Sequence, residues 1–385
     1  MTIVYYALPV IVFASLRLLF GNCWWLGVDV VLTAFEWLAM WLMKDDMKKD
    51  LTYGVQLVGG YMQSVRCNLP WTEIVRTTEY VTTRSGKRVA RERVHHEYHD
   101  CSYTGQTSVG GSSRGIGEKH FNDIVKKWGV MRRYEVIHGD NIAGGSRESY
   151  WYDYRDIINT DKCSGYRRME PIVEHRYYEN KIKNSNSIFR FERIRKEKAK
   201  ELGLYDFMSF SVDTVLAGEG EVPEDVQHAF NVFNSWYAPR VGMRLFVLIF
   251  DANVHKVDIA DKQRAWWQGG NPNEFVVCLG VSGGEVKWCR PWSWSDEPTL
   301  EAEVETWFVK NPGYDLMAFL RWLKKNYTLW KPKDLSDFDY ITVDLTPEQH
   351  LKLLLRAIAI SLAYAVLYVW WLCSFNEWAL RSAFL

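Results

Sequence analysis

The sequence predicts a membrane-anchored protein of mixed α+β and α/β class. Three observations indicate this class. Two apolar runs at 3–20 and 23–43 are separated only by the turn residues Gly21 and Asn22, and a third apolar run covers 351–373. Between these runs, residues 72–101 are rich in Thr, Val and Tyr on either side of a turn at 85–87, which is typical of a β-hairpin. Residues 244–281 read as a strand, a helix and a second strand.

These observations predict five regions along the chain. They are a transmembrane helical hairpin at 1–43, a β-rich region with two hairpins and a basic helix at 44–204, an α/β domain at 205–330, a linker at 331–350, and a C-terminal transmembrane helix with its tail at 351–385.

The apolar runs are long enough to cross the hydrocarbon core of a bilayer, which is about 30 Å thick. A cleaved signal peptide is the alternative for the first run, but no basic segment precedes it. Arg17, Asp29 and Glu36 are the polar contacts expected within the hairpin. We expect Arg17 to pair with Asp29 and Glu36 to face another helix, with an ion path as the alternative.

Lysines flank the predicted spans on one side. Lys44, Lys48 and Lys49 follow the second run, and Lys352 and Arg356 begin the third. The positive-inside rule therefore predicts a multi-pass membrane protein with residues 44–350 on the cytoplasmic side. The expected partners are the lipid bilayer and either a second copy of the chain or another membrane protein.

The predicted hairpin at 72–101 carries a candidate metal site. With a period of two residues, His95, His99 and Cys101 share one face of the returning strand. Imidazole and thiolate are ligands that zinc prefers. A solvated polar strand is the favoured interpretation, because ligands two residues apart on one strand chelate poorly. A second hairpin is predicted at 131–158.

The centre of the predicted α/β domain is built from two strands with apolar residues on both faces, at 244–250 and 275–281. Asp258 is a candidate N-cap for the helix between them. The order strand, helix, strand favours a right-handed crossover with parallel strands. Gly283 and Gly284 predict a tight turn into a third strand at 286–294. Around a two-residue loop, Cys278 and Cys289 lie opposite each other, and we expect both to be buried free thiols.

The stretch from Gly270 through Val281, GNPNEFVVCLGV, resembles the TPM domain, an α/β module of membrane-anchored proteins of bacteria and plastids. The resemblance covers about 224–310, and Asn273-Glu274 stands where the family has Asn-Gly. It also extends to bacterial multi-pass membrane proteins without an assigned function. Since some TPM domains are described as phosphatase-like or metal-binding, the resemblance implies a metal-dependent hydrolase as one hypothesis.

The composition of the chain limits the classes of function that it can have. The chain of 385 residues has 47 basic and 47 acidic residues, so no nucleic acid is expected as a partner. Its seven cysteines form no regular framework, which favours a reducing compartment. Asp251, Asp258 and Asp261 lie where open α/β sheets bind ligands, and they are the candidate metal ligands of a hydrolase. No catalytic residue and no cofactor is identified. The favoured function is an interaction or scaffolding protein, and the alternative is a membrane-anchored phosphatase-like hydrolase.

Overall fold

A computed structural model gives the fold. It describes residues 11, 26–82, 84, 86–111, 113–182, 191–207, 211–218, 221–341 and 343–383. The chain divides into two compact units, and each is described here by itself. Unit 1 contains Met1–Gly54, Tyr177–Arg190 and Leu335–Leu385, and unit 2 contains Val55–Arg176 and Phe191–Asp334.

Unit 1 is built on two long helices, α2 (Leu26–Thr52) and α11 (Pro347–Ala383). A short turn of 3-10 helix, η5 (Leu335–Phe338), precedes α11. The two long helices pack through a small apolar cluster in which Met40 of α2 and Leu353 and Ala357 of α11 are fully buried.

The prediction of a multi-pass membrane protein with spans at 1–43 and 351–385 is wrong. In the part of the chain that the structure describes, no helix is both long enough and apolar enough to cross a bilayer. Helix α2 runs on through the charged residues Lys44–Asp50. Apolar side chains on both helices are used for packing between the helices. The cytoplasmic location predicted for residues 44–350 depended on these spans and is therefore not supported.

The polar contacts predicted for the N-terminal hairpin fall outside what the structure describes. Arg17 lies outside the described residues. Asp29 and Glu36 belong to α2, but their side chains are also outside the described part.

The first sheet of unit 2 is organised by β1 (Tyr53–Asn68), a 16-residue strand. The strand order is β5-β4-β1-β7-β6, and β8 also pairs with β1. The other strands are β4 (Ser102–Thr107), β5 (Ser113–Gly115), β6 (Arg133–His138), β7 (Ser146–Asp153) and β8 (Pro171–Glu179). The helices α3 (Glu118–Trp128), α4 (Arg155–Thr160) and α5 (Lys162–Arg168) belong to this part. The hairpin predicted at 131–158 corresponds to β6 and β7. The residues expected at the end of its second strand form α4 instead.

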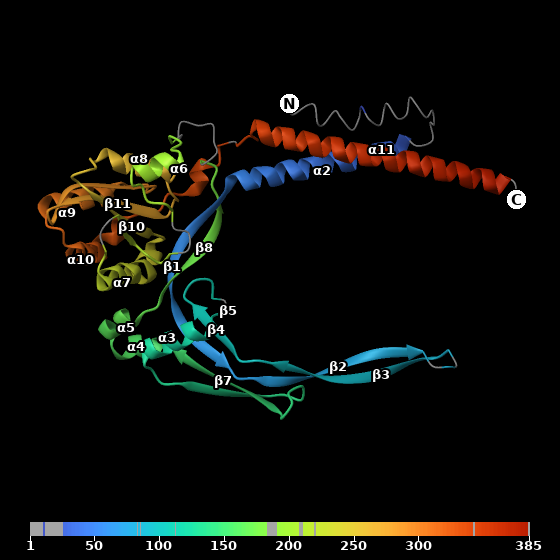
Figure 1. The fold of residues 1–385 in the computed structure, drawn as a ribbon, viewed down its shortest axis with the longest axis horizontal. Coiled ribbons are helices and arrows are strands. Elements are labelled where there is room, and N and C mark those ends of the chain that lie inside the picture. Colours follow the sequence, from blue (N-terminus) through green and yellow to red (C-terminus); the bar gives the residue numbers. More distant parts are fainter. Residues whose placement is uncertain are drawn as a thin grey trace. The chain divides into compact units, whose positions relative to one another are not determined.

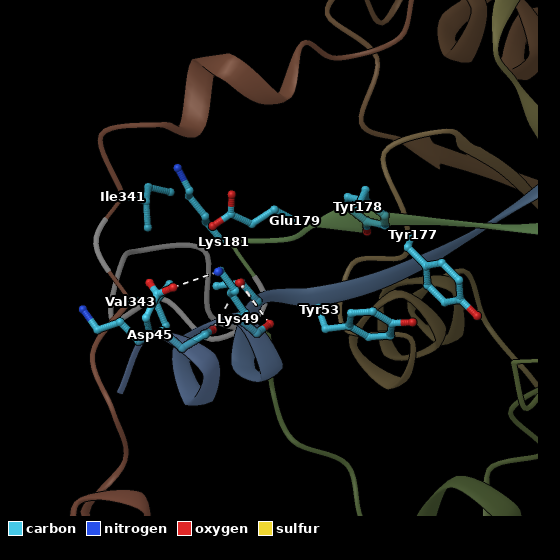
Figure 2. A pocket seen from close by; sticks show the side chains of 11 residues that line it. Asp45, Lys49, Tyr53, Tyr177, Tyr178, Glu179, Lys181, Ile341 and Val343 are labelled. Atoms are coloured by element: carbon cyan, nitrogen blue, oxygen red, sulfur yellow. Dashed lines mark hydrogen bonds and ion pairs between the residues drawn. The ribbon is translucent and has the colours of Figure 1, made fainter. Parts of the chain in front are cut away.

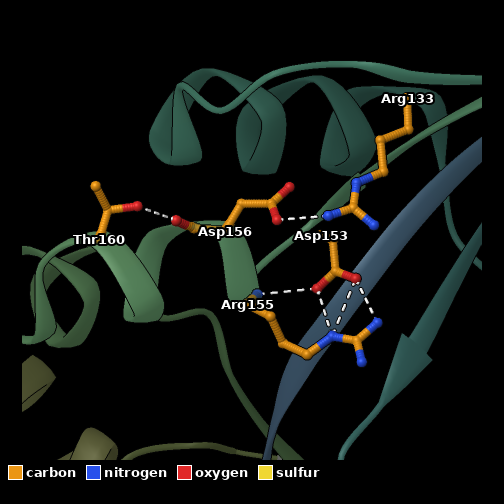
Figure 3. A network of polar contacts seen from close by, with 5 residues as sticks. All are labelled: Arg133, Asp153, Arg155, Asp156 and Thr160. Atoms are coloured by element: carbon orange, nitrogen blue, oxygen red, sulfur yellow. Dashed lines mark hydrogen bonds and ion pairs between the residues drawn. The ribbon is translucent and has the colours of Figure 1, made fainter.

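A polar network fixes the junction of β7 and α4 (Figure 3). Arg155 donates from Nε and Nη2 to the buried carboxylate of Asp153, at 3.0 and 2.6 Å. Arg133 of β6 donates to Asp156 at 2.6 Å, and the Thr160 hydroxyl donates to the carbonyl of Asp156. Burial acts to raise the pKa of Asp153, but the hydrogen bonds from Arg155 outweigh it and lower that pKa. The network joins β6, β7 and α4 into one rigid piece.

The second sheet of unit 2 has the order β12-β11-β10-β9. Its strands are β9 (Val215–Ala217), β10 (Arg244–Asp251), β11 (Glu274–Ser282) and β12 (Glu285–Ser293). Strand β10 is parallel to β9 and β11, and β12 returns antiparallel to β11. The predicted parallel pair and its connection by a helix are confirmed. The surrounding helices are α6 (Lys196–Glu201), α7 (Glu224–Val232), α8 (Asp258–Trp266), α9 (Thr299–Lys310) and α10 (Leu316–Asn326).

Apolar side chains fill both faces of this sheet, as the doubly apolar strands predict. Leu245 and Val247 belong to one cluster with Phe319, whereas Phe246 and Leu248 belong to a second cluster with Trp267. Strands β10 and β11 are therefore covered on both sides and are buried along almost their whole length.

The register between β11 and β12 differs from the predicted one. Gly283 and Gly284 form the turn, but a bulge follows it, and Gly280 pairs with Trp288. The slip of one residue places Cys278 opposite Arg290 and Cys289 opposite Leu279. Both cysteines are free, as expected, but only Cys278 is buried, whereas Cys289 is partly exposed. A Cβ added to Gly280 would lie 2.0 Å from the Trp288 ring, so the absence of a side chain there is what admits the indole.

Candidate functional site

The feature of unit 2 that stands apart from its two sheets is a two-stranded ribbon, β2 (Trp71–Thr82) and β3 (Arg88–His99), called the arm below (Figure 1). The hairpin predicted at 72–101 is confirmed. Its antiparallel register pairs Thr72 with Tyr98 and Thr82 with Arg88. All of β3 except His99, and β2 from Arg76 onward, are exposed. The arm therefore presents both of its faces to the surroundings.

The base of the arm is anchored on its β2 side. The amide of Ile74 donates to the carbonyl of Asn141 at 2.7 Å, and the amide of Ala143 donates to the carbonyl of Thr72 at 2.9 Å. These bonds show that the even-numbered residues of β2 point their backbone groups away from β3. Along an antiparallel pair of strands, the backbone N–H and C=O groups of two opposite residues point toward each other in one pair, and both point outward in the next pair. The even-numbered residues of β3 therefore also point their backbone groups outward.

Three potential metal ligands converge at the base of the arm. Glu73 and Glu97 are direct cross-strand partners, and the ligand atoms of Glu73, Glu97 and His99 all lie within 4.8 Å of one another. His99 Nε2 is 3.0 Å from Glu73 Oε2. Two carboxylates placed directly opposite each other on a sheet repel, so this pair needs a nearby positive charge.

Neighbouring groups hold two members of the triad in place. The Trp71 ring stacks on the His99 ring with centroids 4.5 Å apart, which fixes the plane of the imidazole. Asn141 Nδ2 donates to Glu73 Oε1 at 3.4 Å, which leaves Oε2 facing His99. One imidazole and two carboxylates form a mixed nitrogen and oxygen set that suits Zn²⁺ or Mn²⁺. The triad is the ligand group in which a divalent cation could be held.

The structure separates the three residues that were weighed as a zinc site, whose favoured interpretation was a solvated polar strand. His95 and His99 do lie on one face of the arm, but Cys101 lies beyond the end of β3, with its Sγ 3.4 Å from Sγ of Cys67. Burial raises the pKa of Cys67 to about 11, so Cys67 is a thiol at neutral pH. Glu73 and Glu97 were missed because register, not sequence spacing, brings them to His99.

The three aspartates predicted as metal ligands of a hydrolase are not part of the triad. Each of them also has a different structural role. Asp251 ends β10, and its carboxylate accepts from the amide and side chain of Asn253 at 2.8 and 2.9 Å. Asp258 is the first residue of α8 and contacts Lys262 at 3.3 Å, and it does not act as the predicted N-cap. Among the residues that the structure describes, Asp251, Asp258 and Asp261 do not converge as a three-ligand group.

A pocket of about 520 Å³ lies in unit 1 (Figure 2). Its lining includes the rings of Tyr53 and Tyr177, whose centroids are 5.0 Å apart. Lys49 pairs with Asp45 at 2.8 Å, and this hydrogen bond raises the pKa of Lys49. Lys181 pairs with Asp339, also at 2.8 Å. These two lysines are charged and already held by carboxylates, so neither is poised as a nucleophile or a base.

Comparison with protein-family models, with curated proteins and with solved structures finds no match for this chain. The resemblance to the TPM domain therefore stays a prediction from the sequence.

Proposed function

We propose that this protein is a non-catalytic interaction or scaffolding protein, and that the arm is the element with which it contacts its partner. The observation that carries the proposal is the exposure of apolar side chains on both faces of the arm. Tyr80, Val94 and Tyr98 are exposed on one face, and Val81 and Val89 are exposed on the other. A monomeric protein rarely leaves such a set uncovered without an interaction to cover it.

The length and the free edge of the arm support the same function. A two-stranded ribbon alone is marginally stable in water, and each strand adds 12 residues to a part of the chain with little burial. A long exposed edge is also a template on which another strand can pair. Recognition by strand addition uses this property, with backbone hydrogen bonds supplying affinity and side chains supplying selectivity.

The hydrolase alternative receives less support from the geometry. Its three aspartates do not form a ligand group, and the triad at the base of the arm lies on an exposed ribbon. Hydrolysis at a metal requires a shaped site that limits access of water as well as the ligands themselves. The triad thus fits a role in organising the arm better than a role in catalysis.

Site-specific photocrosslinking in cells tests this proposal without assuming a partner. A benzophenone amino acid replaces Tyr80 on the arm or, as the control, Val309 on α9, which are 72% and 81% exposed. We expect a discrete covalent adduct from position 80 and none of comparable yield from position 309. Absence of an adduct at 80, or the same adducts at both positions, would show that the arm is not a contact element.

A further inference from the structure

We infer that the partner of the arm is a second copy of this chain, paired antiparallel along the outer edge of β3 about a two-fold axis at Val94. This inference rests on the proposed function of the arm as a contact element, and it adds the identity of the partner. It is carried by the backbone orientation of β3 and by the order of its side chains.

The outer edge of β3 offers backbone groups for pairing. Glu92, Val94 and His96 point their amides and carbonyls outward, because their β2 partners have even numbers and outward-facing groups. Within the described residues, β3 is hydrogen-bonded to β2 alone in its sheet. The β2 edge, in contrast, is partly occupied at its base by the loop that contains Asn141. The β3 edge is therefore the longer of the two edges that remain open.

Symmetry restricts how two copies of β3 can pair. In an antiparallel pair the two-fold axis is perpendicular to the sheet, so each residue faces a residue on the same face of the ribbon. The sequence numbers of two opposing residues must therefore have an even sum. An axis at Val94 satisfies this condition and places the outward-facing residues opposite one another.

The side chains are complementary in this register. Glu92 of each copy faces His96 of the other, and Arg91 faces Glu97, so opposite or hydrogen-bonding partners meet on both sides of the axis. Val94 faces itself, with Cα atoms about 5.5 Å apart, as in a hydrogen-bonded pair. Ala90 faces Tyr98, which covers a side chain that is 65% exposed in the single chain.

The two preceding registers are less favourable. An axis one residue earlier, at Arg93, places that arginine against its own copy and sets Glu92 against Val94. An axis at Glu92 places this carboxylate against itself and sets Arg91 against Arg93. Like charges directly opposite each other destabilise a sheet, and the register about Val94 sets no two arginines and no two carboxylates opposite each other.

Pairing in this register also brings a positive charge to the two opposed carboxylates at the base of the arm. Glu97 lies directly opposite Glu73 at the base of the arm, and His99 provides the nearest basic group at 3.0 Å from Glu73. Arg91 of the second copy would bring a guanidinium to Glu97. Because the interface is isologous, it closes at two copies and does not propagate along the same edge.

Sedimentation velocity of the full chain over a range of concentrations tests the inference. Val94→Lys sets two ammonium groups against each other at the axis, so we expect the dissociation constant of the dimer to rise at least about tenfold. Val136→Lys is the matched control, because Val136 is similarly exposed but lies on β6, outside the arm. We expect the control to associate like the unmodified protein.

A charge exchange tests the register itself. Arg91→Glu should weaken the dimer, because it places carboxylates opposite each other, and adding Glu97→Arg should restore it. An unmodified protein that stays monomeric, an unaffected Val94→Lys variant or a failed restoration would overturn the inference. If the photocrosslinked adduct at position 80 contains a different protein, the proposed function stands and this inference fails. If no adduct forms at all, the proposed function fails first.

Discussion

At the scale of single residues, Glu274 is the most unusual ionisable group of the second sheet. Its side chain is fully buried and accepts hydrogen bonds from the amide and Nδ2 of Asn271, at 2.9 and 2.6 Å. Its partner across the parallel register is Arg244, which is also buried. Burial raises the pKa of Glu274 to about 7 and lowers the pKa of Arg244 to about 10.

This raised pKa predicts a pH dependence of stability. The folded chain holds the Glu274 proton up to about pH 7, whereas the unfolded chain releases it near the ordinary value of 4.5. Folding therefore binds a proton in this window, and the contribution to stability is complete below pH 4.5 and is lost as the pH rises through 7. Glu274→Gln stays neutral throughout, so we expect its free energy of unfolding to fall less between pH 5 and pH 8.

Denaturant unfolding at the two pH values measures this difference. Glu303→Gln is the control, because Glu303 is exposed on α9 and should leave the pH dependence unchanged. Equal pH dependence in the unmodified protein and in Glu274→Gln would show that the proton is not bound at Glu274.

At the scale of elements, local pattern predicted the parts whose character is set by neighbouring residues. The doubly apolar run Arg244–Phe250 forms β10, Gly283 and Gly284 form the turn, and the stretch rich in Thr, Val and Tyr at 72–101 forms the arm. Each of these depends on residues close in sequence. The basic helix predicted within 44–204 is present as α6 over Lys196–Glu201.

The features that could not be predicted depend on register. The bulge after Gly284 shifts Cys289 by one position relative to Cys278, and no residue type marks it in advance. The triad depends on the pairing of Glu73 with Glu97, which follows only once the long turn of the arm is placed. Strand β1 was not predicted, although it holds the first sheet together.

The triad predicts a measurable property of the arm. Because Glu73, Glu97 and His99 converge within 4.8 Å on a paired ribbon, we expect the full chain to bind Zn²⁺ at this place. His99→Ala removes the only nitrogen ligand and should lower the affinity at least about tenfold. Isothermal titration of the metal-free protein with Zn²⁺ measures the change.

The control for the zinc titration is His138→Ala, which removes an exposed histidine on β6, away from the triad. The same affinity in the unmodified protein and in His99→Ala would show that the triad is only an ion pair between His99 and Glu73.

At the scale of the whole molecule, total charge and total hydropathy are poor guides to function. The chain is neutral overall, yet the distal part of the arm from Glu79 to Arg93 has five basic and two acidic residues, a net charge of +3. The absence of a nucleic-acid partner, inferred from the total, stays a prediction. The apolar runs suggested membrane spans, whereas α2 and α11 pack against each other through a few apolar side chains such as Met40 and leave others, such as Trp41 and Trp370, exposed.

The central claim is that two copies of the chain pair along β3, and residue-resolved amide hydrogen exchange tests it most directly. The amides of Arg91, Arg93 and His95 face β2, so they should be protected at every protein concentration. The amides of Glu92, Val94 and His96 face outward, so we expect them to exchange quickly in dilute protein and to become protected as the concentration rises. Fast exchange of these three amides at all concentrations would contradict the account.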